Sequence, residues 1–225
     1  MNSEAVAQTL TIPVDKEHGG IRLVVIIVFV GTWIAGFFLV NMLLSGTGIS
    51  LLSIIIAFGI AYGASAGLEA ILKRRWPSGR VVQVEHDGVK LIKKGTLQKE
   101  MMSEDPVSVI LWSFTVSKRA RVPKGWSMLG CALEYEGEYL AVYGFLSPAQ
   151  VEAFELAPNF KKLVGKRKQA DVPGVRDDLR IAGEQRRLRD AEAHRWIEGA
   201  EMQADDLITY VKRIQSQFPE WMSEN

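Results

Sequence analysis

Three histidines and one cysteine are the residues of this sequence best suited to bind a metal ion or act as nucleophiles. His18, His86 and His194 lie far apart, in segments of different character. Cys131 is the only cysteine, so the chain can form neither an internal disulfide nor a site with several thiolate ligands. It lies in an apolar stretch, which favours a small core residue over a reactive thiol.

Motifs with catalytic spacing are missing from the sequence. It contains no H-E-x-x-H pair for zinc, no nucleophile elbow and no glycine loop of the kind that cradles phosphate. We therefore expect that the chain is not an enzyme and that it binds no cofactor and no metal ion.

One glycine series has the spacing of a helix-packing motif. Gly59, Gly63 and Gly67 recur every fourth residue in an apolar segment. Residues at this spacing share one face of a helix, where a second helix backbone can approach closely inside a membrane. The second helix would belong either to another subunit or to the preceding apolar segment. In the latter case the contact would use Gly31, Thr32, Ala35 and Gly36.

The segment that carries these glycines is apolar enough to cross a bilayer. Residues 23–68 contain no charged residue and no histidine, although the whole chain has a net charge of +1 and 48% hydrophobic residues. Two apolar runs, 23–44 and 49–72, are each long enough to span a bilayer core. The short linker between them allows only a tight turn. We predict a transmembrane helical hairpin over residues 21–72.

Flanking charges predict how this hairpin is oriented. Lys73, Arg74 and Arg75 follow the second run, and Lys16 and Arg22 precede the first, whereas the linker has no cation. Because cytoplasmic flanks carry the excess of Lys and Arg, we expect both termini to be cytoplasmic. The chain would then be a multi-pass protein of the plasma (inner) membrane.

A second group of cations gathers around one apolar loop. Such a mixture suits anionic lipid headgroups, although a solvated loop is an equal alternative. The near-zero net charge argues against nucleic acid as a partner. We expect membrane lipids as partners, together with a protein partner or a second copy of the chain. The candidate lipid-facing residues are Lys118, Arg119, Arg121, Lys124 and Trp126.

The sequence pattern of residues 80–146 predicts β-strands. Polar and apolar residues alternate, and Asp87-Gly88 is a strong hairpin signal. We predict about six strands in an antiparallel meander. Ser147 and Gln150 then form a capping box, with Pro148 at the first helical position. The helix that follows would pack on the sheet through Val151, Phe154 and Leu156.

This order of elements resembles bacterial membrane proteins with a PH-like domain. The matching elements are the span pair at 23–72, the strand at 81–86, the Asp87-Gly88 hairpin, Trp112 in a central strand and the helix from Ser147. The resemblance covers residues 21–165. It implies seven strands in two near-orthogonal sheets capped by a helix, and it transfers no catalytic residue.

The C-terminal segment predicts one long amphipathic helix over residues 175–220. Its apolar positions follow alternating steps of four and three, as in a heptad seam. The helix could pack along its own β domain, form a coiled coil with another subunit, or lie on the membrane. The seam contains Ala193, Ile197, Ala200, Ala204, Leu207, Val211, Ile214 and Phe218. The candidate partner-binding residues are Ile197, Leu207, Val211, Ile214 and Phe218.

The predicted fold class is membrane-anchored α+β in four parts. A polar segment at 1–20 precedes the hairpin at 21–72, a cytoplasmic PH-like β domain with its capping helix at 79–165, and the long helix at 175–220. We expect a non-catalytic adaptor or scaffold that presents the PH-like domain and the heptad helix to a protein or lipid. The alternative is an accessory subunit of a larger membrane complex, such as a transporter or respiratory assembly, held by the glycine groove.

Overall fold

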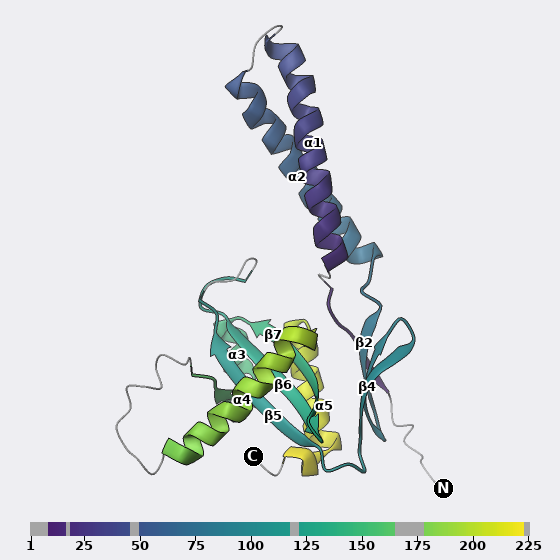
Figure 1. The fold of residues 1–225 in the computed structure, drawn as a ribbon, viewed down its shortest axis with the longest axis vertical. Coiled ribbons are helices and arrows are strands. Elements are labelled where there is room, and N and C mark those ends of the chain that lie inside the picture. Colours follow the sequence, from purple (N-terminus) through teal and green to yellow (C-terminus); the bar gives the residue numbers. More distant parts are fainter. Residues whose placement is uncertain (1–8, 17–18, 46–49, 118–121, 165–177, 223–225) are drawn as a thin grey trace. The chain divides into compact units, whose positions relative to one another are not determined.

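The computed structural model describes residues 9–16, 19–45, 50–117, 122–164 and 178–222 (Figure 1). The chain divides into two compact units. One unit, within residues 15–78, contains both apolar helices. The other combines the residues before 15 with those after 78 and contains the sheets. The structure is therefore mixed α+β, as predicted.

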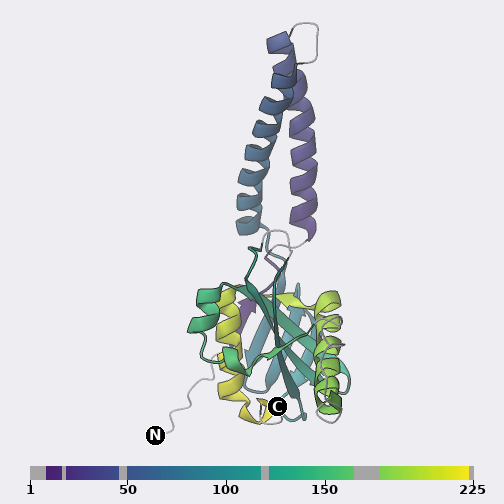
Figure 2. The ribbon, with the colours of Figure 1, turned by 90° about the vertical axis from the view of Figure 1, so that its left-hand side faces the viewer.

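Two antiparallel helices form the first unit (Figure 2). α1 covers Gly19–Ser45 and α2 covers Leu51–Arg75. Both are long and apolar enough to cross a membrane. Their bounds match the predicted pair of helices, and most of the linker between them lies outside the described residues.

The face of α2 that packs against α1 consists of alanines and serines. Ser53, Ala57, Ala61 and Ser65 are buried, each four residues after the last. A Cβ atom added to Gly36 of α1 would lie 3.6 Å from the Cβ atom of Ala57. Small side chains thus permit the close approach, as expected between helices in a membrane.

Two polar residues of these helices have local partners. The side-chain oxygen of Asn41 accepts a hydrogen bond from the backbone N–H of Ser50 at 3.0 Å, just before α2 begins. An N–H group at a helix start has no partner within the helix, so this bond helps to define where α2 starts. Near the other end of α2, Glu69 forms an ion pair with Lys73 at 3.0 Å.

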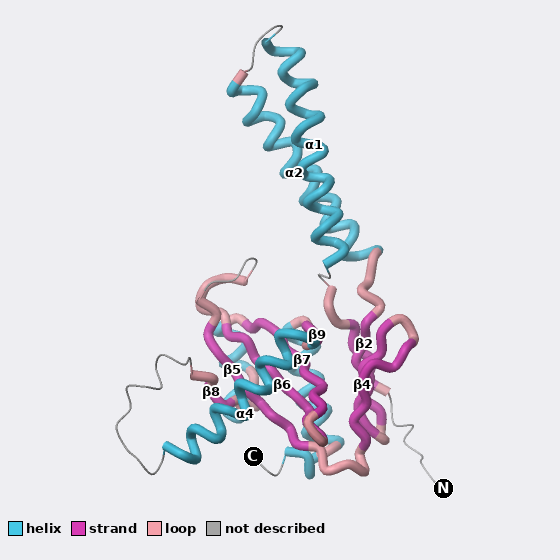
Figure 3. Tube along the Cα trace, in the orientation of Figure 1, coloured by secondary structure: helices cyan, strands magenta, loops and turns pink. Residues whose placement is uncertain are grey.

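The second unit contains two sheets (Figure 3). The first sheet is antiparallel and has the order β1-β2-β3-β4. Its strands are β1 Leu10–Pro13, β2 Arg80–Glu85, β3 Gly88–Lys93 and β4 Thr96–Met102.

The second sheet has the order β8-β5-β6-β7-β9. Its three long strands are antiparallel, and the two short edge strands run parallel to their neighbours. The strands are β5 Ser108–Thr115, β6 Ser127–Tyr135, β7 Glu138–Leu146, β8 Lys161–Lys162 and β9 Ala200–Glu201. All six strands predicted over residues 80–146 are present.

Strand β1 was not predicted. The predicted β domain began at residue 79, and this boundary is wrong because β1 also belongs to the first sheet. It lies in the segment expected to be a polar leader, yet Ile12 and Val14 are only 3% and 1% exposed and belong to the core. β1 pairs with β2, with Leu10 opposite Val84. The two apolar helices are therefore inserted in the sequence between two adjacent strands of one sheet.

The capping box predicted at Ser147 is present, but the helix that it begins is short. α3 covers only Pro148–Ala153 and buries none of its own residues. Phe154, which follows it, is 2% exposed and contacts Phe160 in the core. A different helix, α5 (Ala204–Gln217), covers the core between the sheets.

The prediction of a single long C-terminal helix over residues 175–220 is wrong, because two helices occupy this region. The first, α4, covers Asp178–Glu198, and β9 separates it from α5. The break occurs at Gly199, where a Cβ atom would lie 2.4 Å from the carbonyl oxygen of Arg195. Ala200 then pairs with Val142 of β7, so strand pairing interrupts the heptad spacing.

Helix α4 (Asp178–Glu198) is polar, yet it packs on the second sheet. Its Leu188 and Ala191 meet an apolar cluster on the face away from α5. The indole N–H of Trp112 donates to Glu192 at 2.9 Å, and Glu192 also forms an ion pair at 2.6 Å with Arg195. Because Arg195 is 5% exposed, this pairing provides the partner that a buried charge requires.

Candidate binding groove

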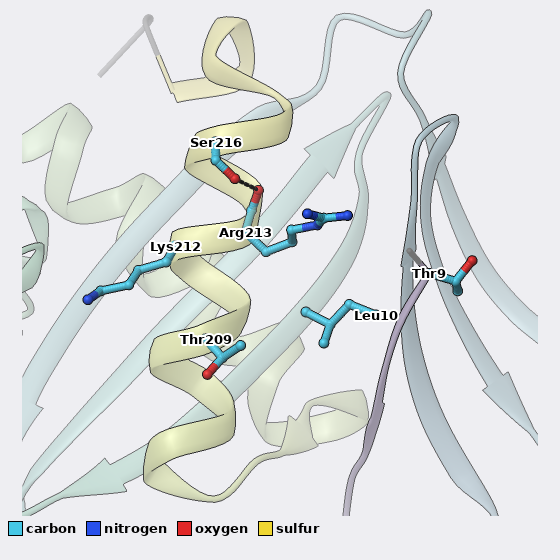
Figure 4. A pocket seen from close by; sticks show the side chains of 6 residues that line it. All are labelled: Thr9, Leu10, Thr209, Lys212, Arg213 and Ser216. Carbon is cyan, nitrogen blue, oxygen red and sulfur yellow. Dashed lines mark hydrogen bonds between the residues drawn. The ribbon is translucent and has the colours of Figure 1, made fainter. Parts of the chain in front are cut away.

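A groove of about 480 Å³ lies between β1 and α5, within the strand-rich unit (Figure 4). One wall is the start of β1 and the other is one face of α5. The lining residues are Thr9, Leu10, Thr209, Lys212, Arg213 and Ser216.

The amphipathic pattern of α5 places its polar residues in the groove. The four lining residues of α5 follow the spacing i, i+3, i+4, i+7 and so share one helical face. Leu207, Val211 and Ile214 on the opposite face are fully buried. The apolar face thus holds the helix on the core. The Arg213 side chain points towards β1, whereas the Lys212 side chain extends to the other side of α5 (Figure 4).

Strand β1 lies at the edge of its sheet, so half of its backbone groups have no strand partner among the described residues. The N–H of Val14 donates to the carbonyl of Arg80 at 3.0 Å, and β1 and β2 are antiparallel. Hydrogen-bonded pairs alternate along such a ladder, so Leu10 and Ile12 also bond to β2. The backbone groups of Thr9 and Thr11 therefore point to the open edge.

The groove combines this strand edge with positive charge. Lys212 is exposed, and Arg213 lies beside it. The hydroxyl of Ser216 donates to the Arg213 carbonyl at 3.0 Å, and that of Thr209 donates to the Asp205 carbonyl at 2.8 Å. Their lone pairs remain available as acceptors. These groups can bind an extended backbone and acidic side chains.

The structure does not bring together the described histidines and the cysteine, the residues best suited to bind a metal ion or act as nucleophiles. Cys131 is fully buried, and burial raises the pKa of its thiol to about 12. His86 is exposed in a turn, and His194 stacks on Tyr139 at 4.2 Å. His18 lies outside the described residues. Among the residues that the structure describes, no group of His, Cys, Asp or Glu could hold a metal ion.

The predicted glycine groove does not receive α1. Cβ atoms added to Gly59, Gly63 and Gly67 would each meet no atom of the described residues within 4 Å, the nearby backbone of α2 itself aside. The interpretation in which the first apolar helix fills the groove is therefore wrong. The alternative, a contact with another subunit, stays a prediction.

The predicted partner-binding residues divide into two groups. Ile197 is 76% exposed. The others cannot meet a partner without unfolding, because they are buried in the core of their own unit. The buried residues are Leu207, Val211, Ile214 and Phe218.

The predicted lipid-facing loop is only partly described. Lys118, Arg119 and Arg121 lie outside the described residues. Lys124 is exposed, whereas Trp126 is half-buried and its carbonyl accepts from Val116 at 2.7 Å. The structure thus describes one cation and one aromatic residue of this predicted surface.

Sequence reasoning missed the groove because it missed β1. The available signal was the alternation of exposed Thr9, Thr11 and Pro13 with apolar neighbours, ending at a proline typical of edge strands. The run is only four residues long and precedes a transmembrane-like segment, so its pairing with residues 80–85 could not be derived from periodicity.

Comparison of the chain with family models, with curated proteins and with solved structures finds no match.

Proposed function

We propose that this protein is a non-catalytic, membrane-anchored adaptor whose strand-rich unit binds an extended, acidic protein segment at the cytoplasmic face. In this proposal α1 and α2 cross the plasma (inner) membrane with both termini cytoplasmic. The observation that carries the proposal is the groove between β1 and α5. There an open strand edge lies opposite Arg213, and Lys212 also lines the groove.

The chemistry of the groove favours this kind of partner. An extended segment can add to an exposed strand edge through main-chain hydrogen bonds, while side-chain pockets provide specificity. Cations on the facing helix favour acidic side chains and steer their approach. An open edge is also an aggregation hazard, which proteins usually cover or blunt. A bound segment would cover it.

The strand count supports the proposed PH-like character of the unit. Strands β1 to β7 divide into four in one sheet and three long strands in the other, and α5 covers the core between them. PH-like domains have seven strands in two sheets capped by a helix. The capping role in this proposal belongs to α5 and not to the helix that starts after Ser147.

The test uses the full chain in lipid nanodiscs and two sets of fluorescent peptides. One set is rich in Glu, and the control set has Gln in place of Glu. We expect fluorescence anisotropy to show binding of the Glu peptides, weakened several-fold by Lys212→Glu. Lys162→Glu is a matched control because Lys162 is exposed on β8, away from the groove.

A second variant tests the strand edge separately from charge. Thr11→Pro removes an N–H group that points away from β2, so it removes no ladder bond. We expect this variant to stay folded and lose peptide binding. Peptide binding that neither Lys212→Glu nor Thr11→Pro changes would contradict the proposal.

One observation favours the second candidate function, an accessory subunit of a larger membrane complex. Cβ atoms added to Gly59, Gly63 and Gly67 would meet no described residue outside their own helix turn within 4 Å, so another transmembrane helix could approach this face. An accessory subunit should co-purify with large membrane proteins in mild detergent. An adaptor should run alone or as a homo-oligomer in the same detergent.

A further inference from the structure

The last turn of α4 carries two adjacent apolar side chains that face solvent. Trp196 is 77% exposed and Ile197 is 76% exposed. Among the described residues of the strand-rich unit, no other large apolar side chain is as exposed. Paired exposure of this kind marks an interaction surface more often than scattered single residues do.

This pair is held beside the start of β2. The guanidinium of Arg80 donates to the carbonyls of Glu198 at 2.6 Å and Gly199 at 3.2 Å. Lys99 forms an ion pair with the Glu198 carboxylate. Cations at a helix C-terminus are favourable because the last carbonyls are unsatisfied. The end of α4 is therefore fixed to the strand that the chain enters directly after α2.

The connections between this corner and the two apolar helices are short in the sequence. β2 begins five residues after α2 ends at Arg75, a reach of at most about 18 Å. Val14, which bonds to Arg80, is likewise five residues before α1 begins at Gly19. Both connections leave the strand-rich unit at the same corner and both are short.

Cations and a further apolar side chain occur at this corner. The N–H of Lys94 donates to the carbonyl of Gly79 at 2.6 Å, which places the β3–β4 turn beside the same connection. Lys93 and Lys94 are exposed, and Leu97 is 50% exposed. Lysines together with Trp and aliphatic side chains are typical of a surface that meets anionic headgroups.

We infer that the corner formed by Lys93, Lys94, Leu97, Trp196 and Ile197 docks on the anionic lipid surface of the bilayer that anchors the chain. Trp196 and Ile197 enter the headgroup region, and the two lysines contact lipid phosphates. This inference rests on the proposed membrane insertion of α1 and α2. The short connections favour lipid over a protein as the occupant, because they hold the corner close to the headgroups.

The test measures depth in the membrane at three positions of the full chain. Cysteines replace Ile197, Ile181 or Ile55 one at a time, and each is labelled with the environment-sensitive fluorophore NBD. The native Cys131 is buried and does not compete. The proteins are placed in nanodiscs of phosphatidylcholine and phosphatidylglycerol, with or without doxyl-labelled lipid.

Ile181 is the matched control, because it is exposed on the same helix but about 24 Å further along its axis. Ile55, exposed in the second turn of α2, reports on insertion itself. We expect blue-shifted emission and quenching by doxyl lipid at 197 and 55, and neither effect at 181. We also expect Lys93→Gln with Lys94→Gln to reduce the quenching at 197.

Three results would overturn the inference. Quenching at 55 without quenching at 197 would leave membrane insertion standing and reject the lipid-docked corner. A blue shift at 197 without quenching would mean that a protein surface covers the pair instead. Absence of quenching at 55 would reject the proposed insertion, and the inference with it.

Discussion

The backbone N–H of Val14 donates to the carbonyl of Arg80 at 3.0 Å, although both apolar helices lie between these residues in the sequence. The chain thus forms one strand, builds the helix pair and then returns to pair with its own beginning. Ile12, next to this bond, is packed in the core between the two sheets. The strand-rich unit therefore depends on residues from both sides of the apolar helices.

The first prediction is that β1 is essential for the stability of this unit. Ile12→Ala should lower the free energy of unfolding by about 2–4 kcal/mol, because it leaves a cavity in the core. Thr11→Ala, on the exposed side of the same strand, should change it by less than about 0.5 kcal/mol. Denaturant unfolding of the full chain in detergent measures both. Equal effects of the two substitutions would show that β1 does not pack as described.

The second prediction compares two tyrosines. The hydroxyl of Tyr143 donates to Glu201 at 2.9 Å, whereas the fully buried hydroxyl of Tyr210 has no hydrogen-bond partner among the described residues. Tyr143→Phe should cost about 1 kcal/mol, because it leaves a partner without its bond. Tyr210→Phe should leave stability unchanged or raise it. A larger loss for Tyr210→Phe than for Tyr143→Phe in thermal unfolding would contradict this difference.

The third prediction compares two residues of the predicted heptad seam, one buried in α5 and one exposed at the end of α4. Leu207→Asp would bury a carboxylate in the core and should cost more than about 4 kcal/mol at every protein concentration. Ile197→Asp should have little effect on unfolding, because that side chain is exposed. A loss for Leu207→Asp that shrinks as protein concentration rises would mean that the residue packs against another chain.

Local patterns were sufficient to predict most of the secondary structure. The apolar runs predicted both long helices, and Gly137 lies in the turn of the β6–β7 hairpin. The β2–β3 hairpin is present too, but its turn is His86-Asp87, one residue before the predicted Asp87-Gly88. Turn chemistry and side-chain periodicity act within a few residues, so a single sequence carries them. The capping box at Ser147 was predicted correctly for the same reason.

Pairing between distant segments could not be predicted in this way. β1 meets β2 across the whole helix pair, and β9 joins β7 at the point where a regular 4-3 spacing suggested an unbroken helix. The one local signal that the helix ends there was Gly199, since glycine is unfavourable inside a helix and common at its end. The groove depends on both long-range features, so its residues did not stand out in the sequence.

The fourth prediction separates the two small-residue faces of α2. Ala61→Leu should weaken the pairing of α1 with α2 by roughly 1–3 kcal/mol, because Ala61 is fully buried between them. Gly63→Leu should leave this pairing intact, since a Cβ atom at Gly63 would meet no residue of α1 within 4 Å. We expect it instead to reduce association with other transmembrane helices, seen as a smaller oligomer in detergent. An unchanged oligomeric state would mean that the glycine face contacts lipid.

The central claim is that α1 and α2 cross a membrane and hold the strand-rich unit on the cytoplasmic side. Its most direct test places single cysteines at Thr47, between the two apolar runs, and at Ser117, an exposed residue after β5. Burial keeps the native Cys131 thiol protonated and unreactive. In intact cells, a membrane-impermeant maleimide should label the cysteine at 47 and leave the one at 117 unlabelled until the membrane is permeabilised. Labelling at 117 but not at 47 would reverse the orientation, and equal labelling of both would contradict a membrane-spanning hairpin.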